Sequence, residues 1–141
     1  MSSKKSKKAV IIAHRLNFKP LINSAISKAI EKECPFTMDE LISNNRKLEL
    51  AIWRHAVLTS YAINGNKTVE VGKMFNRNHS TVIHSLRNTS DELDIGAENG
   101  IVDKILTLYN CALNYNVCEN TTFNIQKYES GNITSQPNIG G

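Results

Sequence analysis

The sequence predicts an all-α fold, a helical bundle that contains a helix-turn-helix. Between residues 18 and 117, apolar residues recur at spacings of three and four, which is the periodicity of amphipathic helices. No stretch alternates apolar and polar residues for long enough to predict a strand. Two short apolar-patterned segments, residues 68–75 and 79–92, are separated by three residues, as is typical of a helix-turn-helix.

The elements on either side of this motif follow from local signals. Apolar residues from Leu21 to Ile30 form one helical stripe, which ends before Pro35 because the residue preceding a proline avoids the α conformation. Thr37 and Glu40 form the pattern of a capping box, which predicts a short helix after them. Residues 48–63 are apolar on two edges, so we expect a long central helix there.

The chain of 141 residues is long enough for one domain with tails. We expect a flexible basic arm at 1–17, where lysines lie among serines, and a disordered polar tail at 118–141. The domain then spans residues 18–117. Its last helix, 101–117, is expected to close the bundle, with self-association or docking of a partner as the less favoured alternatives.

Composition and charge exclude several classes of protein. No apolar run reaches the ~18 residues that span a membrane, so we expect no membrane contact. Three cysteines without an exporting segment predict free thiols and a cytoplasmic location. Residues 1–87 contain 15 Lys/Arg and 6 Asp/Glu, whereas residues 88–141 contain 2 and 7. This asymmetry indicates a polyanion partner on one side, although an ordinary solvated charged face gives the same counts.

The second helix of the motif presents a polar face beside its predicted core residues Val82, Ile83 and Leu86. We expect the following residues to face solvent: His79, Ser80, Thr81, His84, Ser85, Arg87 and Asn88. Small polar side chains on a helix can approach the edges of bases in the major groove of DNA, beginning at the N-terminus of the helix. The alternative is a polar face that is merely solvated.

These residues also resemble a known family. Residues 77–84 are similar to the Gly-Arg-Asp-His-Ser/Thr-Thr-Val signature of domain IV, the C-terminal DNA-binding domain of the bacterial replication initiator DnaA. Glu70-Val71-Gly72, Arg54 and Asn45-Arg46-Lys47 fit the same family in the same order, so that the resemblance covers about residues 20–93. It implies a Trp-repressor-like helix-turn-helix that binds double-stranded DNA at origins, in replication initiation or its regulation.

The resemblance also implies roles for single residues. Asn78, His79 and Ser80 would contact bases in the major groove, and Arg54 would enter the adjacent minor groove. The residues that would bind phosphates are Arg46, Lys47, Thr68, Arg77 and Thr81, to which the helix pattern adds Arg87. With about five phosphates bound, the logarithm of affinity should fall against the logarithm of salt concentration with a slope of about −4 to −5.

Two departures from the family affect these expectations. Asn78 stands where the family has an acidic residue. Because an amide pairs with adenine whereas a carboxylate accepts from cytosine, we expect a different base preference there, by roughly 1–3 kcal/mol. Asn76 stands in place of glycine in the turn, and asparagine tolerates the left-handed conformation that such a turn needs.

The sequence also sets limits on function. It contains no P-loop motif, so we expect no nucleotide, and it shows no catalytic or metal-binding pattern, so we expect neither an enzyme nor a cofactor. The expected partner is DNA, with self-association or a replication protein as further possibilities. The absence of other initiator domains suggests a stand-alone module, nucleoid-associated or, if a phage encodes it, active in the host cytoplasm. A transcriptional regulator and a protein-interaction module remain alternatives.

Overall fold

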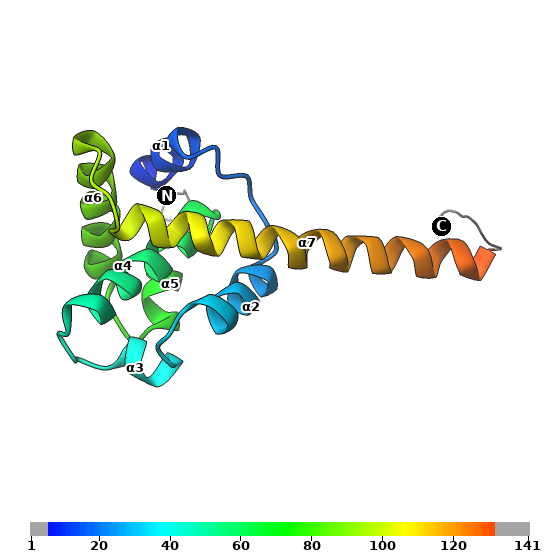
Figure 1. Cartoon of the computed structure of the whole chain (residues 1–141), viewed down its shortest axis with the longest axis horizontal. Helices are drawn as coiled ribbons and strands as arrows, with labels where there is room; N and C mark the ends of the chain where they lie inside the picture. Colours follow the sequence, from blue (N-terminus) through cyan, green and yellow to red (C-terminus); the bar gives the residue numbers. More distant parts are fainter. Residues whose placement is uncertain (1–5, 132–141) are drawn as a thin grey trace.

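A computed structural model of the chain describes residues 6–131, with side chains described as far as Asn116. Its elements are all helices, which confirms the predicted all-α class for the described residues (Figure 1). In order they are α1 (Lys7–Arg15), α2 (Asn23–Glu33), α3 (Met38–Ile42), α4 (Leu48–Ile63), α5 (Thr68–Met74), α6 (His79–Ile95) and α7 (Ile101–Gly131).

The helix α4 forms the centre of the bundle. It packs against each of the other helices, and its residues are buried without interruption from Ala56 to Ile63. Its bounds agree with the predicted helix, and its two apolar edges have neighbours on both sides. Trp53 and Tyr61 belong to this core, as predicted, so neither aromatic ring is available to stack on a base.

The local signals around α2 and α3 act as predicted. The helix α2 ends at Glu33, directly before Cys34 and Pro35. In the capping box of α3, the Glu40 amide donates to Thr37 Oγ1 at 3.1 Å, and the Thr37 amide donates to Glu40 Oε1 at 2.8 Å. These bonds satisfy two amide groups that the first turn of a helix leaves free, so they fix where α3 begins.

The flexible arm predicted for residues 1–17 is wrong for residues 7–15, which form α1. Ser6 caps this helix by accepting a hydrogen bond from the Ala9 amide, and Ala9 and Ile12 are buried against the bundle. At the other end, the Arg15 guanidinium bonds Asp94 of α6 at 2.8 Å. Burial of one side of this short segment offsets the entropy of ordering it. Residues 1–5 lie outside the described part of the chain.

The first half of α7 closes the bundle, as predicted, with Ile101, Ile105, Leu108 and Ala112 buried. The tail predicted to be disordered from Cys118 is wrong for residues 118–131, because α7 continues to Gly131 and projects beyond the other helices (Figure 1). No glycine or proline interrupts the chain between Ile101 and Gly131. Residues 132–141 lie outside the described part.

Candidate nucleic-acid interface

The helix-turn-helix consists of α5 and α6, joined by a turn that is held by backbone contacts. The Arg77 amide donates to the Gly72 carbonyl at 2.8 Å. A Cβ atom on Gly72 would lie 2.6 Å from the Arg77 carbonyl oxygen, so only glycine allows this approach of the turn to α5. Asn76 has φ of 56°, which confirms the left-handed conformation predicted for it. The turn therefore sets the start of α6 relative to α5.

Asn78 caps the N-terminus of α6 rather than pointing freely into solvent. Its Oδ1 atom accepts from the amides of Ser80 at 3.1 Å and Thr81 at 3.4 Å, and also from the Ser80 hydroxyl. The side-chain oxygen is thus occupied within the helix cap, whereas its amide nitrogen remains a potential donor. This differs from the predicted bidentate pairing with adenine, which uses both atoms.

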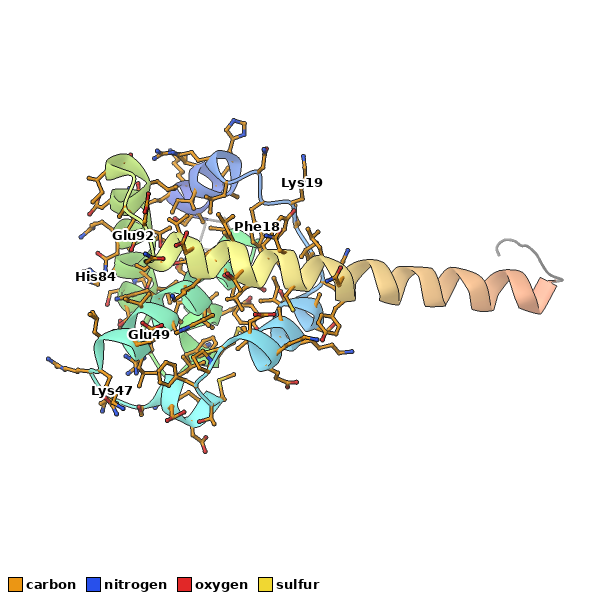
Figure 2. All side chains as sticks on the ribbon, viewed as in Figure 1. Phe18, Lys19, Lys47, Glu49, His84 and Glu92 are labelled. Carbon is orange, nitrogen blue, oxygen red and sulfur yellow. The ribbon has the colours of Figure 1, made fainter. Side chains whose placement is uncertain are left out.

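The exposed face of α6 agrees with the prediction except at two positions. His79, Ser80, His84 and Arg87 are exposed, and His84 projects outward from α6 in Figure 2. The remaining predicted residues, Thr81 and Asn88, are partly exposed.

The first exception is Ser85, which is fully buried and not solvent-facing. Its hydroxyl lies 2.7 Å from Nδ1 of His55 on α4. One turn further along, the hydroxyls of Thr59 and Thr89 bond each other at 3.1 Å. A small polar side chain can be buried here because α4 supplies its partner, which the pattern of α6 alone does not show.

The second exception is Ile83, which was predicted to be core but is 37% exposed. It lies one turn after His79 on the same face of α6, so an apolar side chain stands among the polar ones. A side chain of this kind can contact the methyl group of thymine in the major groove. Sequence reasoning missed this residue because it assigned Ile83 to the core together with its apolar neighbours Val82 and Leu86.

The loop between α3 and α4 is bound by two arginines. Arg54 of α4 donates through Nε to the Leu41 carbonyl at 2.8 Å, and through Nη2 to the carbonyls of Ser43 at 3.0 Å and Asn45 at 3.1 Å. Arg77, from the turn before α6, bonds the carbonyls of Leu41 and Ser43 and donates to Asn44 Oδ1 at 3.1 Å. The Arg54 guanidinium therefore does not project freely toward a minor groove in this structure, nor does it pair with Glu49, which bonds Lys104.

The remaining cations predicted to bind phosphate are exposed. Arg46 and Lys47 end the α3–α4 loop, and Lys47 projects into solvent (Figure 2). Through Arg77, the structure brings this loop together with the turn that precedes His79. Thr68 at the start of α5 is partly exposed and Arg87 on α6 is exposed, but no hydrogen bond among the described residues joins them to this cluster.

The described residues offer neither a metal site nor a membrane span. No group of histidine, cysteine, aspartate and glutamate among them is arranged to hold a metal ion. Within the same part of the chain, no helix is both long and apolar enough to cross a bilayer.

Part of the chain is similar to a known family of proteins. Residues 24–88 match the family described as the bacterial dnaA protein helix-turn-helix. This segment of the chain is similar to that family. The match runs from α2 into α6, so it contains the DnaA-type helix-turn-helix together with the α3–α4 loop, whereas α1 and α7 lie outside it. The chain has no match among solved structures. A DnaA-type helix-turn-helix indicates a DNA-binding function.

Proposed function

We propose that the chain binds double-stranded DNA in a sequence-specific manner, with the first turns of α6 in the major groove and the α3–α4 loop against the backbone. The observation that carries this proposal is the exposure of His79 and Ser80 at the N-terminus of α6 within a DnaA-type helix-turn-helix. Recognition helices of this kind contact bases with their N-terminal residues. Ile83 and His84 continue the same face by one turn.

Charge supports this orientation of the helix. Arg46 and Lys47 are exposed in the loop that Arg77 joins to the start of α6, and Arg87 is exposed in the middle of α6. These cations attract phosphates to this side of the motif. Thr68 and Thr81 are accessible for further phosphate contacts.

The cap at Asn78 modifies the base preference that we propose. Because its oxygen serves the helix, the amide nitrogen is the atom available to a base, and it donates. A donor suits base pairs with an acceptor in the major groove, such as adenine N7 or guanine, and cannot accept from cytosine N4 as a carboxylate does. We therefore propose that the preferred site differs at this base from that of relatives with an acidic residue.

A base-contact test uses His79→Ala, with His14→Ala as a matched control on the exposed side of α1. Loss of base contacts should reduce discrimination between a selected duplex and a scrambled one by about 1–3 kcal/mol, with little change in binding to the scrambled duplex. Both affinities are measured by fluorescence anisotropy for each variant. Unchanged discrimination in His79→Ala, or an equal loss in His14→Ala, would show that α6 does not contact the bases in this way.

The biological use that we propose is replication initiation or its regulation, since the motif is of the DnaA type. Genome-wide mapping of bound DNA tests this use separately from binding itself. Sites concentrated at a replication origin support it, whereas sites concentrated at promoters indicate a transcriptional regulator.

A further inference from the structure

The α3–α4 loop is attached to two different elements by arginine side chains. Arg54 extends from the middle of α4, and Arg77 extends from the turn that precedes α6. Both guanidinium groups bond the same two carbonyl groups, those of Leu41 and Ser43. The two arginine side chains therefore hold the end of α3 and the loop through hydrogen bonds.

The charges of this pair have no local compensation. Among the described residues, neither guanidinium forms an ion pair with a carboxylate. Burial and the neighbouring Arg77 charge both lower the pKa of Arg54. Two like charges held side by side are unfavourable unless other groups stabilise them, and here the stabilising groups are carbonyls of the last turn of α3 and of the loop that follows it. The arrangement therefore depends on the loop keeping its conformation.

Bonds within the loop add to this organisation. The Asn45 amide donates to Ser43 Oγ at 3.3 Å, and the Lys47 amide donates to Asn45 Oδ1 at 2.9 Å. Arg46 and Lys47 follow directly and are exposed. The loop conformation thus determines where these two cations stand relative to the start of α6.

We propose that Arg54 and Arg77 are positioning residues, which join the α3–α4 loop to the turn before α6 so that both approach one duplex as a preformed unit. This inference rests on the proposed DNA-binding function. It assigns to both arginines a role through the loop, in place of the base and phosphate contacts that the family resemblance implies. A guanidinium suits this role because its planar fork donates to several acceptors at once, which the single ammonium of lysine does not reproduce.

The first test needs no DNA. Arg54→Lys and Arg77→Lys keep the charge but remove the fork, so hydrogen exchange at the amides of Asn45 and Lys47 should accelerate by about fivefold or more. The matched control is Arg87→Lys, on an exposed arginine of α6, which should leave these amides unchanged. Exchange in the core of α4 reports whether each variant is folded. Unchanged loop exchange in both folded variants would overturn the proposal.

A milder variant keeps the test decisive if an arginine substitution prevents folding. Asn44→Ala removes an exposed side-chain acceptor of Arg77 without changing the core. It should accelerate exchange at Asn45 and Lys47 by a smaller factor, about twofold to fivefold. If the loop amides of this variant exchange at the original rate, Arg77 does not hold the loop through this contact and the proposal fails.

The second test measures coupling in DNA binding. Lys47→Ala should weaken DNA binding by the original chain. In the Arg54→Lys background the loop is already displaced, so the same substitution should weaken binding by a factor that is at least about threefold smaller. Additive losses would contradict a positioning role.

If Arg54→Lys instead leaves the loop amides protected and reduces preference for A·T pairs beside the core site, Arg54 contacts the minor groove directly. Absence of any DNA binding would refute the proposed function, while the exchange test would still decide the role of the arginines.

Discussion

Asn78 shows how one side chain serves both the fold and the proposed contact with DNA. Its Oδ1 atom caps α6, and only its amide nitrogen remains available for a base. Asparagine and aspartate cap helices about equally well, so an exchange between them separates the two uses.

The variant Asn78→Asp should therefore keep the stability of the chain and change its choice of DNA. We expect the free energy of unfolding to change by less than about 0.5 kcal/mol, whereas Asn78→Ala should lose about 1 kcal/mol with the cap. Selection from a random duplex library should move toward cytosine at the contacted position, because a carboxylate accepts from its N4 amino group. An identical selected site for both proteins would show that residue 78 contacts no base.

Gly72 is the residue on which the geometry of the turn depends. A methyl group there would overlap the backbone carbonyl of Arg77, which belongs to the turn and cannot rotate away. Gly72→Ala should therefore cost about 1–3 kcal/mol of stability and also weaken DNA binding, because α6 is displaced.

Gly96→Ala is the matched control for this substitution. Gly96 has φ of 70°, and no other atom lies within 4 Å of the position that a Cβ atom would take there. The change should therefore cost about 1–2 kcal/mol through backbone strain alone. Thermal unfolding and anisotropy are measured for both variants. Equally tight DNA binding by Gly72→Ala and Gly96→Ala would contradict this role of the turn.

At the scale of elements, α4 and α6 are joined by a partly buried polar contact. His55 of α4 lies 2.7 Å from the Ser85 hydroxyl of α6. Burial is the main cause that lowers the pKa of His55, and the nearby His84 and Arg54 lower it further, while Glu92 acts in the opposite direction. The neutral imidazole is therefore the form that the folded chain favours.

This contact predicts a loss of stability in mild acid. Because the folded pKa of His55 lies below its unfolded value of about 6.5, the stabilisation is present above that pH and is lost as the pH falls below it. The free energy of unfolding should decrease between about pH 7.5 and 5.5, measured by urea denaturation. His55→Gln should show a smaller decrease over the same range, and an equal decrease would assign the effect to other groups.

The sequence predicted the positions of the helices better than it predicted which of their side chains are buried. Three predictions that depend only on neighbouring residues are confirmed: the bounds of α4, the capping box of Thr37 and the left-handed conformation of Asn76. The burial of Ser85 depends on His55, 30 residues away, so no local pattern could reveal it. The same holds for α1, whose two buried residues are too few to form a recognisable stripe beside its lysines.

The candidate site was predicted to a similar extent. The exposed face of α6 follows from its periodicity, and the family resemblance located the α3–α4 loop and its cations. The positions of Arg54 and Arg77 did not follow, because a chain pattern shows that an arginine is polar but not which carbonyl groups it will bond. Such contacts depend on how three elements meet in space.

At the scale of the whole molecule, the described residues form one bundle. Two of its helices, α1 and α7, lie outside the family match and pack against the DnaA-type segment. The helix α1 packs against α6 and α4, and α7 packs against α2 and α4 (Figure 1). The first turns of α6 and the α3–α4 loop keep exposed residues that neither helix covers. The fold therefore leaves the proposed DNA surface accessible.

The salt dependence of binding to a selected duplex is the most direct measurement of the proposed DNA surface. If the exposed cations Arg46, Lys47 and Arg87 displace counterions from about three phosphates, the logarithm of affinity should fall linearly against the logarithm of salt concentration, with a slope of about −3. A chain that binds no duplex at about 50 mM salt, or whose affinity does not depend on salt, would contradict a DNA-binding surface at the N-terminus of α6.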